Sequence, residues 1–281
     1  MKFVLGLTNW PEHWELTNRA AVKAEELGFW GLSMPDHYVR GGGTNAGTLD
    51  SWFALAHLAS KTKLIHVGTM VTPIPLRPPA LLAKMVATVD VISNGRTFLG
   101  VGAGWLRREF EAYSEWNESS VRVSKTEEGL KLIRDLWTKE KVDFLGKYYR
   151  VGGGVLEPKP IQKPHPPLLF GGSGPRMLRF AGKYGEIVFL PPDLKLGFAE
   201  AKNMVLDSAK ESKRTGKISF ATGSPVHESG RGPAEYIPER FQRAVLEAQK
   251  NGCEYFDFSV PENGLLDSMS DFAKNVIPSF T

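Results

Sequence analysis

Residues 63–113 read KLIHVGTMVTPIPLRPPALLAKMVATVDVISNGRTFLGVGAGWLRREFEAY, and the pattern of this segment is the main evidence for the fold. β-Branched and apolar residues alternate over 64–70, which predicts a β-strand. Prolines interrupt 72–79, so we expect a loop there that neither strand nor helix enters. Apolar residues recur every three or four positions over 80–92, which predicts a helix with one buried face. The nearly continuous apolar run at 97–101 is typical of a parallel strand that is covered on both sides. The stretch is therefore predicted to form a βαβ unit.

The predicted helix ends at Asn94-Gly95, and its apolar face is expected to pack on a sheet. The residues of that face are Leu81, Leu82, Met85, Val86, Val89 and Ile92. After the second strand comes Gly102-Ala103-Gly104, followed by the start of another helix. Such a loop presents bare N–H groups beside a helix N-terminus and can hold a phosphate. A plain turn explains the same glycines, and both interpretations stand at this point.

The strand–helix alternation continues along the chain and predicts eight β/α repeats. We expect strands at 3–7, 29–34, 64–70, 97–101, 168–170, 187–190, 218–222 and 255–260, and helices at 14–27, 51–60, 80–92, 106–138 with a break near 115–120, 177–184, 198–215, 238–251 and 265–280. Eight such repeats predict a (β/α)8 TIM barrel, a fold that takes about 250 residues. We expect one domain over residues 1–281.

Two segments interrupt the alternation between the fourth and fifth strands. Residues 142–155 are predicted to form a hairpin that turns at Gly146-Lys147, and 157–167 holds five prolines in eleven residues. We expect residues 142–167 to be an insertion in the barrel. A polar loop with Gly41-Gly42-Gly43 is expected after the second strand.

Composition excludes several classes of protein. The 281 residues are 42% hydrophobic and 23% charged, which is ordinary for a globular protein, and the net charge of +4 comes from scattered lysines and arginines. Without a basic run, nucleic-acid binding is not expected. Cys253 is the only cysteine, so an internal disulfide is excluded. The amino-terminal apolar run is too short for a signal peptide or a membrane span, and we expect a cytoplasmic protein without a membrane partner.

In a parallel barrel the ligand site lies where the strands end at their carboxyl side, so the residues there are the candidates. The second strand ends in Asp36-His37, a carboxylate beside a group that titrates near neutrality. The pair is suited to proton transfer, and a salt-bridged loop pair is the alternative. No metal site is predicted, because the other histidines lack partners at ligand spacing; they are His13, His57, His66, His165 and His227.

Several motifs of the opening stretch together resemble the luciferase-like monooxygenase superfamily. They are Pro73 to Pro79, Asn94-Gly95-Arg96, Leu99-Gly100-Val101-Gly102, Gly104-Trp105 and Glu109. The resemblance implies a bacterial-luciferase-like barrel. Members that use the deazaflavin coenzyme F420 commonly carry Asp-His at the end of the second strand, whereas many users of flavin mononucleotide (FMN) carry Glu-His. Asp36-His37 therefore resembles the F420-dependent members.

This resemblance also implies roles for individual residues. Asp36 would hydrogen-bond the cofactor ring, and His37 would exchange the proton that accompanies hydride transfer. Met70-Val71 would form a non-proline cis peptide against the ring. The remaining implied cofactor ligands are Thr72 on the ring, amides of Ala103, Gly104, Gly172 and Ser173 on the phosphate, and Arg108 on the cofactor tail.

Two tryptophans are candidates for the substrate pocket. Trp105 stands where the sugar-phosphate dehydrogenases of the superfamily carry a catalytic glutamate, so that reaction is not expected here. A tryptophan at this place would give an apolar, stacking pocket, and packing at the helix start is the alternative. Trp10, at the end of the first strand, is open to the same two interpretations. Arg176, Arg179 and Lys183 are interpreted as a solvated helix face outside the site.

Three functions follow from the resemblance. The first is an oxidoreductase that transfers a hydride between F420 and a small organic substrate. The second is an FMN-dependent monooxygenase that uses reduced flavin and oxygen, with a separate reductase as partner. The third is a flavin-binding paralogue without turnover. The resemblance further implies a homodimer or a higher homo-oligomer.

Overall fold

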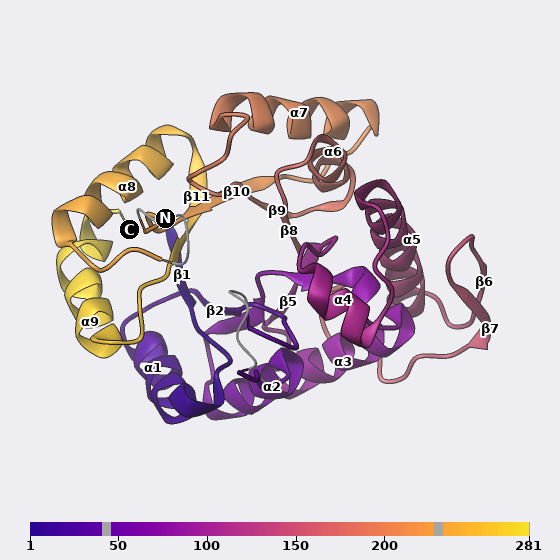
Figure 1. The fold of residues 1–281 in the computed structure, drawn as a ribbon, viewed down its shortest axis with the longest axis horizontal. Helices are drawn as coiled ribbons and strands as arrows, with labels where there is room; N and C mark the ends of the chain where they lie inside the picture. The colour runs from indigo at the N-terminus through magenta and orange to yellow at the C-terminus, as the bar shows by residue number, and fades with distance from the viewer. Residues whose placement is uncertain (41–45, 228–232, 281) are drawn as a thin grey trace.

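The computed structural model describes residues 1–40, 46–227 and 233–280, and its centre is a closed parallel barrel (Figure 1). The described barrel strands are β1 (Lys2–Gly6), β2 (Gly31–Met34), β3 (His66–Thr69), β5 (Thr97–Gly102), β8 (Leu168–Gly171), β9 (Ile187–Phe189), β10 (Ser219–Gly223) and β11 (Cys253–Phe258). They pair in the order β3-β2-β1-β11-β10-β9-β8-β5, and β3 also pairs with β5, which closes the ring. The predicted (β/α)8 fold is confirmed.

Helices surround the barrel, as Figure 1 shows. They are α1 (Trp14–Glu26), α2 (Ser51–Lys61), α3 (Pro79–Ile92), α4 (Arg107–Tyr113), α5 (Ser119–Thr138), α6 (Pro175–Tyr184), α7 (Phe198–Glu211), α8 (Pro238–Lys250) and α9 (Leu265–Asn275), with short 3₁₀ helices η1 (Pro11–His13), η2 (Ile74–Leu76) and η3 (Ile277–Ser279). The predicted break in the long helical region is confirmed, because α4 ends before α5 begins. This break puts α4 in front of the barrel in Figure 1.

The buried stripe of α3 differs from the prediction in two residues. Leu82, Val86 and Val89 are buried, as expected from their spacing. Leu81 and Ile92 are 53% and 45% exposed, so their predicted place on the buried face was wrong. The stripe instead includes Ala83 and Ala87, since positions three, four, seven and eight apart share one side of a helix.

The sequence prediction was also wrong at the two ends of the third strand. β3 begins at His66, and Leu64 is exposed on its approach. The expected loop at 72–79 contains a short strand, β4 (Thr72–Pro73), which pairs with Val101 and Gly102, and it continues into η2. Proline is tolerated in β4 because this strand lies at the end of the pairing order and its N–H groups need no second neighbour.

Two glycines allow the barrel to close between β3 and β5. A Cβ atom at Gly68 would lie 2.4 Å from the carbonyl oxygen of Phe98, and one at Gly100 would lie 2.0 Å from the carbonyl oxygen of Thr69. No side chain fits at such distances. The close approach of the two strands therefore requires glycine on both of them.

The predicted hairpin is confirmed as β6 (Val142–Leu145) and β7 (Arg150–Gly154), an antiparallel pair that lies apart from the barrel sheet (Figure 1). The predicted loop at Gly41-Gly42-Gly43 lies outside the described residues. Among those residues, no helix combines the length and the apolar character that crossing a bilayer requires.

Replacing Gly100 with alanine should destabilise the protein by about 2–3 kcal/mol, because the new methyl group would collide with the backbone of Thr69. Gly152→Ala on β7 is the matched control, since a Cβ there meets no atom within 4 Å. Urea denaturation of both variants measures the difference. If Gly100→Ala were as stable as Gly152→Ala, the barrel would not depend on this close approach.

Candidate active site

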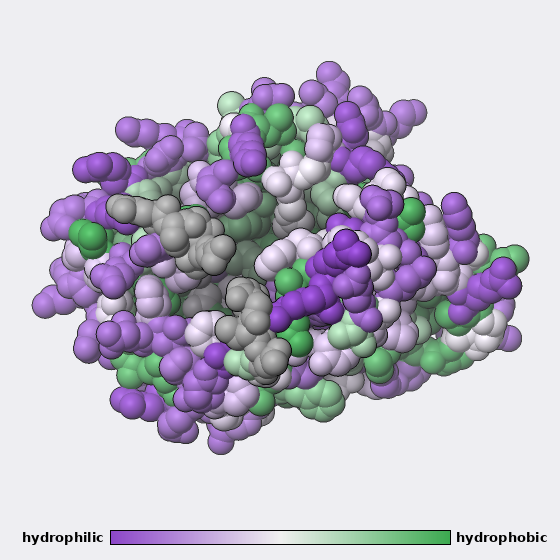
Figure 2. Space-filling model, in the orientation of Figure 1, coloured by the Kyte–Doolittle hydropathy of each residue, from purple (hydrophilic) through white to green (hydrophobic). Residues whose placement is uncertain are grey.

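The carboxyl ends of the strands surround two neighbouring hollows. The first has a volume of about 680 Å³ and the second about 590 Å³, and Met70 lines both of them. Figure 2 shows that this face is hollowed near its centre and that apolar colouring continues into the hollow. The first is lined by His37, Met70, Val71, Gly102, Ala103, Gly104, Trp105, Ser119, Ser120, Arg122, Gly171, Gly172, Gly174 and Arg176, among others. Its size suits a ring cofactor or a substrate of similar size.

His37 projects into the first hollow from the end of β2 and is held by Glu109 of α4. The Nδ1 atom of His37 lies 3.0 Å from Glu109 Oε2, and Glu109 is fully buried. Glu109 Oε1 also accepts a hydrogen bond of 2.5 Å from the backbone N–H of Tyr38. A carboxylate acceptor at Nδ1 fixes the tautomer that carries its proton there, so Nε2 is left to exchange a proton.

Trp105 lies beside His37 at the mouth. The two rings meet edge to face with centroids 5.6 Å apart, and Trp105 is 66% exposed. It therefore lines the hollow, and core packing, the alternative left open by the sequence, is wrong.

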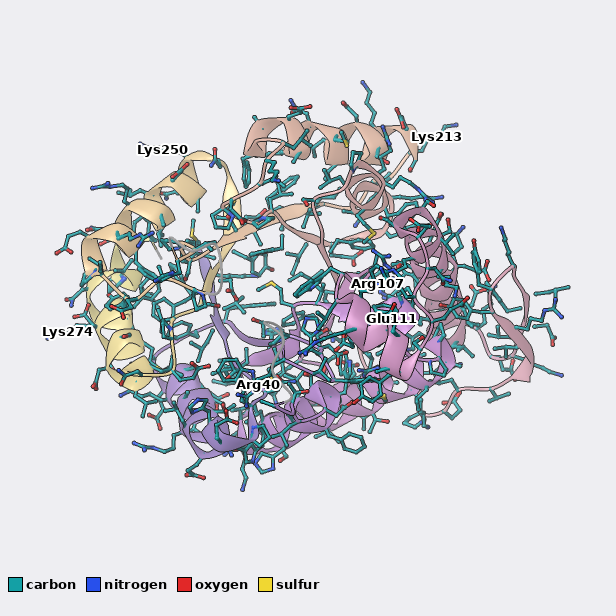
Figure 3. The ribbon with its side chains drawn as sticks, in the orientation of Figure 1. Arg40, Arg107, Glu111, Lys213, Lys250 and Lys274 are labelled. Carbon is teal, nitrogen blue, oxygen red and sulfur yellow. The ribbon has the colours of Figure 1, made fainter. Side chains whose placement is uncertain are left out.

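Figure 3 shows the exposed ion pair of Arg107 and Glu111 on α4, while the labelled lysines lie at the periphery of the molecule.

Asp36 and Thr72 lie behind this surface and are not among the described residues that line the first hollow. Asp36 is fully buried, pairs with Arg77 at 2.7 Å and accepts a hydrogen bond of 2.7 Å from the hydroxyl of Thr72. Burial raises the pKa of Asp36, and the charge of Arg77 and the hydroxyl oppose that rise. The observed contacts are with protein groups, so the implied contacts of both residues with a cofactor stay predictions.

The predicted cis peptide between Met70 and Val71 is confirmed, and it lies on the boundary of the two hollows. The side chain of Val71 occupies space that two glycines leave open. A Cβ at Gly102 would lie 2.5 Å from Val71 Cγ2, and one at Gly171 would lie 2.8 Å from Val71 Cγ1. The ends of β5 and β8 thus hold Val71 between them as part of the floor of the hollow.

The glycine loops after β5 and β8 face the same hollow. Ala103, Gly104 and Gly172 line it, and Gly104 has a φ of 80°, which favours glycine. Ser173 is exposed and is not among the described lining residues. A phosphate cradle made by the backbone of these loops is compatible with this arrangement.

The starts of α5 and α6 add groups to the hollow that the sequence analysis did not assign to the site, including Arg176, which it interpreted as part of a solvated face outside the site. Ser119, Ser120 and Arg176 line the hollow beside these two helix N-termini. The guanidinium of Arg176 donates hydrogen bonds to the carbonyl of Ser120 at 2.7 Å and to the hydroxyl of Ser124 at 3.0 Å, which ties α6 to α5. Two helix N-termini and a cation favour an anion at this end of the hollow.

Two residues that were predicted to belong to the site do not line the first hollow. Arg108 donates a hydrogen bond to the carbonyl of Arg40 and is not among the described lining residues of the first hollow. Trp10 lines the second hollow, where the guanidinium of Arg40 lies 4.3 Å from its ring centroid. Trp10 and Trp105 therefore belong to different hollows at one mouth.

The second hollow contains a buried acid, Asp257 of β11. It accepts hydrogen bonds from the hydroxyl of Ser33 at 3.1 Å and from the hydroxyl of Ser259 at 2.5 Å. Burial raises the pKa of Asp257 to about 6, and the two hydroxyl groups only partly oppose the rise. Sequence patterns contain little sign of this residue, because Asp257 lies inside a mainly apolar strand.

A protein-family comparison identifies the family to which this fold belongs. The model of the luciferase-like monooxygenase family matches residues 5–237. The chain belongs to this family. The family resemblance inferred from the opening stretch is confirmed, and the stretch, the cis peptide and His37 all lie within the matched residues.

Named relatives match a shorter part of the chain. The F420-dependent glucose-6-phosphate dehydrogenase of Amycolatopsis mediterranei is 36% identical over 170 residues, which are 59% of this chain and 50% of that protein. The FMNH(2)-dependent dimethylsulfone monooxygenase of Pseudomonas putida is 35% identical over 133 residues, 47% of this chain and 36% of that protein. The chain thus matches half or less of the length of these relatives.

A solved structure shares the fold over the whole chain. The structure of an F420-dependent secondary alcohol dehydrogenase with an F420–acetone adduct covers 100% of both chains with a TM-score of 0.83 and 22% identity. At this identity the likeness supports the barrel fold.

Asp257→Asn should stabilise the protein near neutral pH. Between about pH 4 and pH 6 the folded state keeps Asp257 protonated while the unfolded chain ionises it, so wild-type stability falls as pH rises. The shift from 3.8 to about 6 corresponds to about 3 kcal/mol. Urea denaturation at about pH 4 and pH 7.5 tests this: the stability of the variant relative to wild type should rise by that order. An equal difference at both pH values would contradict it.

Proposed function

We propose that the protein is an oxidoreductase that transfers a hydride between coenzyme F420 and a small organic substrate. The observation that carries the proposal is the first hollow, in which His37, the Val71 floor and the glycine loops meet. The relative from Amycolatopsis mediterranei, named as F420-dependent, supports the choice of cofactor. When bound, F420 supplies two-electron hydride chemistry at its ring.

The residues of the hollow fit a cofactor that has a flat ring and a phosphate. Val71 and Met70 offer an apolar surface at the centre, where Gly102 and Gly171 keep the neighbouring strands free of side chains. Gly104, Gly172 and the N-terminus of α6 offer N–H groups at one end, with Arg176 beside them. Apolar contact for the ring and donors for an anion are therefore available in one space.

His37 is proposed to move the proton that accompanies the hydride. When an alcohol is oxidised to a ketone, its carbon loses a hydride and its oxygen loses a proton. The Nε2 atom of His37 can accept that proton, because Glu109 occupies Nδ1 and stabilises the imidazolium that forms. Glu109 is thus a positioning residue for His37.

FMN-dependent monooxygenation remains the alternative, and the 35% identity with the FMNH(2)-dependent relative favours it. A separate reductase would then be a partner. The glycine loops would serve the phosphate of either cofactor. A homo-oligomeric state, a cytoplasmic location and the assignment of residues 1–281 to one domain with an insertion at 142–167 stay predictions.

Titration of the purified protein with F420 and with FMN should give tighter binding of F420. Arg176→Ala should weaken that binding about tenfold, because a charge-assisted contact with the phosphate is lost. Arg179→Ala is the matched control, since it removes an exposed arginine of the same helix away from the first hollow. Submicromolar affinity for FMN with none for F420 would favour the alternative, and equal effects of both variants would remove Arg176 from the site.

His37→Ala should lower the rate of hydride transfer by roughly 10²-fold or more while leaving F420 affinity nearly unchanged. The first substrate to test is 2-propanol, because a structural neighbour is named as a secondary alcohol dehydrogenase. The absorbance of F420 reports the reaction. His57→Ala, at an exposed position of α2, is the control. Unchanged turnover in His37→Ala would show that another group handles the proton.

A further inference from the structure

The second hollow opens beside the proposed cofactor site and has its own polar centre. It lies between β1, β2 and β11, and Met70 separates it from the first hollow. Most of its wall is apolar or backbone, including Leu7, Trp10, Pro35 and Val260. At about 590 Å³ it has room for a single-ring organic molecule.

Asp257 is a buried acid in the wall of this hollow, and neighbouring side chains hold its carboxyl group in place. The hydroxyl groups of Ser33 and Ser259 each donate to one of its carboxyl oxygens. A Cβ at Gly6 would lie 2.0 Å from Ser259 Oγ and 3.3 Å from Asp257 Oδ2, so a side chain there would displace the hydroxyl that orients the carboxyl group. The strands on both sides therefore hold the carboxyl group in one orientation at the surface of the hollow.

The two buried aspartates of the mouth differ in their partners. Asp36 has the guanidinium of Arg77 at 2.7 Å and lies behind the first hollow. Asp257 has two hydroxyl groups, and no lysine or arginine of the described residues lies within ion-pair distance of it. Each carboxyl oxygen can accept a second hydrogen bond. A buried carboxyl group without a cation is costly unless a further donor approaches it.

We propose that Asp257, oriented by Ser33 and Ser259, anchors a hydrogen-bond donor of the substrate, a hydroxyl or an amine, in the second hollow. This inference rests on the proposed function, since it places the substrate at Met70, on the border of the proposed cofactor site. The substrate class is a small, mainly apolar molecule whose donor group for Asp257 is separate from the hydroxyl that reacts at His37. Glu262 and His227 also line the hollow, and the acidic side chains disfavour a carboxylate substrate.

Calorimetric titration of the cofactor-loaded protein with benzylamine, benzyl alcohol and toluene tests the proposal. The three probes share one ring and differ in the donor. At least one donor-bearing probe should bind about tenfold tighter than toluene. Asp257→Asn should weaken the binding of that probe about tenfold and leave the affinities for toluene and F420 unchanged. Ser259→Ala should weaken the binding of the same probe by a smaller factor, because Ser33 still orients the carboxyl group. Asp267→Asn, the same change at an exposed place on α9, should alter none of them.

Tighter binding of benzylamine would identify an amine as the donor group of the substrate. Tighter binding of benzyl alcohol would identify a hydroxyl. The proposal is overturned if toluene binds as well as both, if Asp257→Asn binds the donor probe like wild type, or if none of the three binds. Failure of the proposed function has a different signature, which is no affinity for F420 or FMN. In that case the same titration of the cofactor-free protein still decides the role of Asp257.

Discussion

The seating of Val71 between Gly102 and Gly171 is the constraint on which the mouth of this barrel depends. Any side chain at either glycine would occupy the space of the valine methyl groups. The bulge at Met70-Val71 therefore has a fixed place between β5 and β8, on the border of both hollows. Closure of the barrel at Gly68 and Gly100 joins β3 to β5, two residues before Gly102 on β5, so fold and site both require glycine on this strand.

The buried acids around this floor differ in whether a positively charged or ring group of the protein pairs with them. Arg77 neutralises Asp36 and Glu109 orients His37, and both acids are fully buried. Asp257 is buried too, but hydroxyl groups are its partners. Asp36 has a cation beside it and does not line the first hollow, whereas Asp257 has no such cation among the described residues and lies at a cavity, where a ligand can reach it. This difference separates the residues that build the mouth from those proposed to act in it.

The sequence was sufficient for the barrel because the periodicity of strands and helices is local. The strand ends, the Met70-Val71 bulge and His37 could be found from position and resemblance. The side chains that pair with His37 and Asp36 could not be found in this way. Glu109 is 72 positions from His37 in the chain, and Arg77 is 41 positions from Asp36. Arg176 has the spacing of a solvated helix face, and only the approach of α5 to α6 brings it to the hollow. Asp36 and His37 are adjacent in sequence, yet one faces the core and the other the cavity, which spacing alone cannot distinguish.

The central claim is that the floor at Val71 and the donors at α6 receive one cofactor. A crystal structure of the protein soaked with F420 tests it most directly. We expect the ring against Met70 and Val71, with the phosphate beside Gly172 and the N-terminus of α6 and with Nε2 of His37 facing the ring. A ring bound in the second hollow against Asp257, or outside the barrel mouth, would show that Val71 and the N-terminus of α6 do not hold one cofactor.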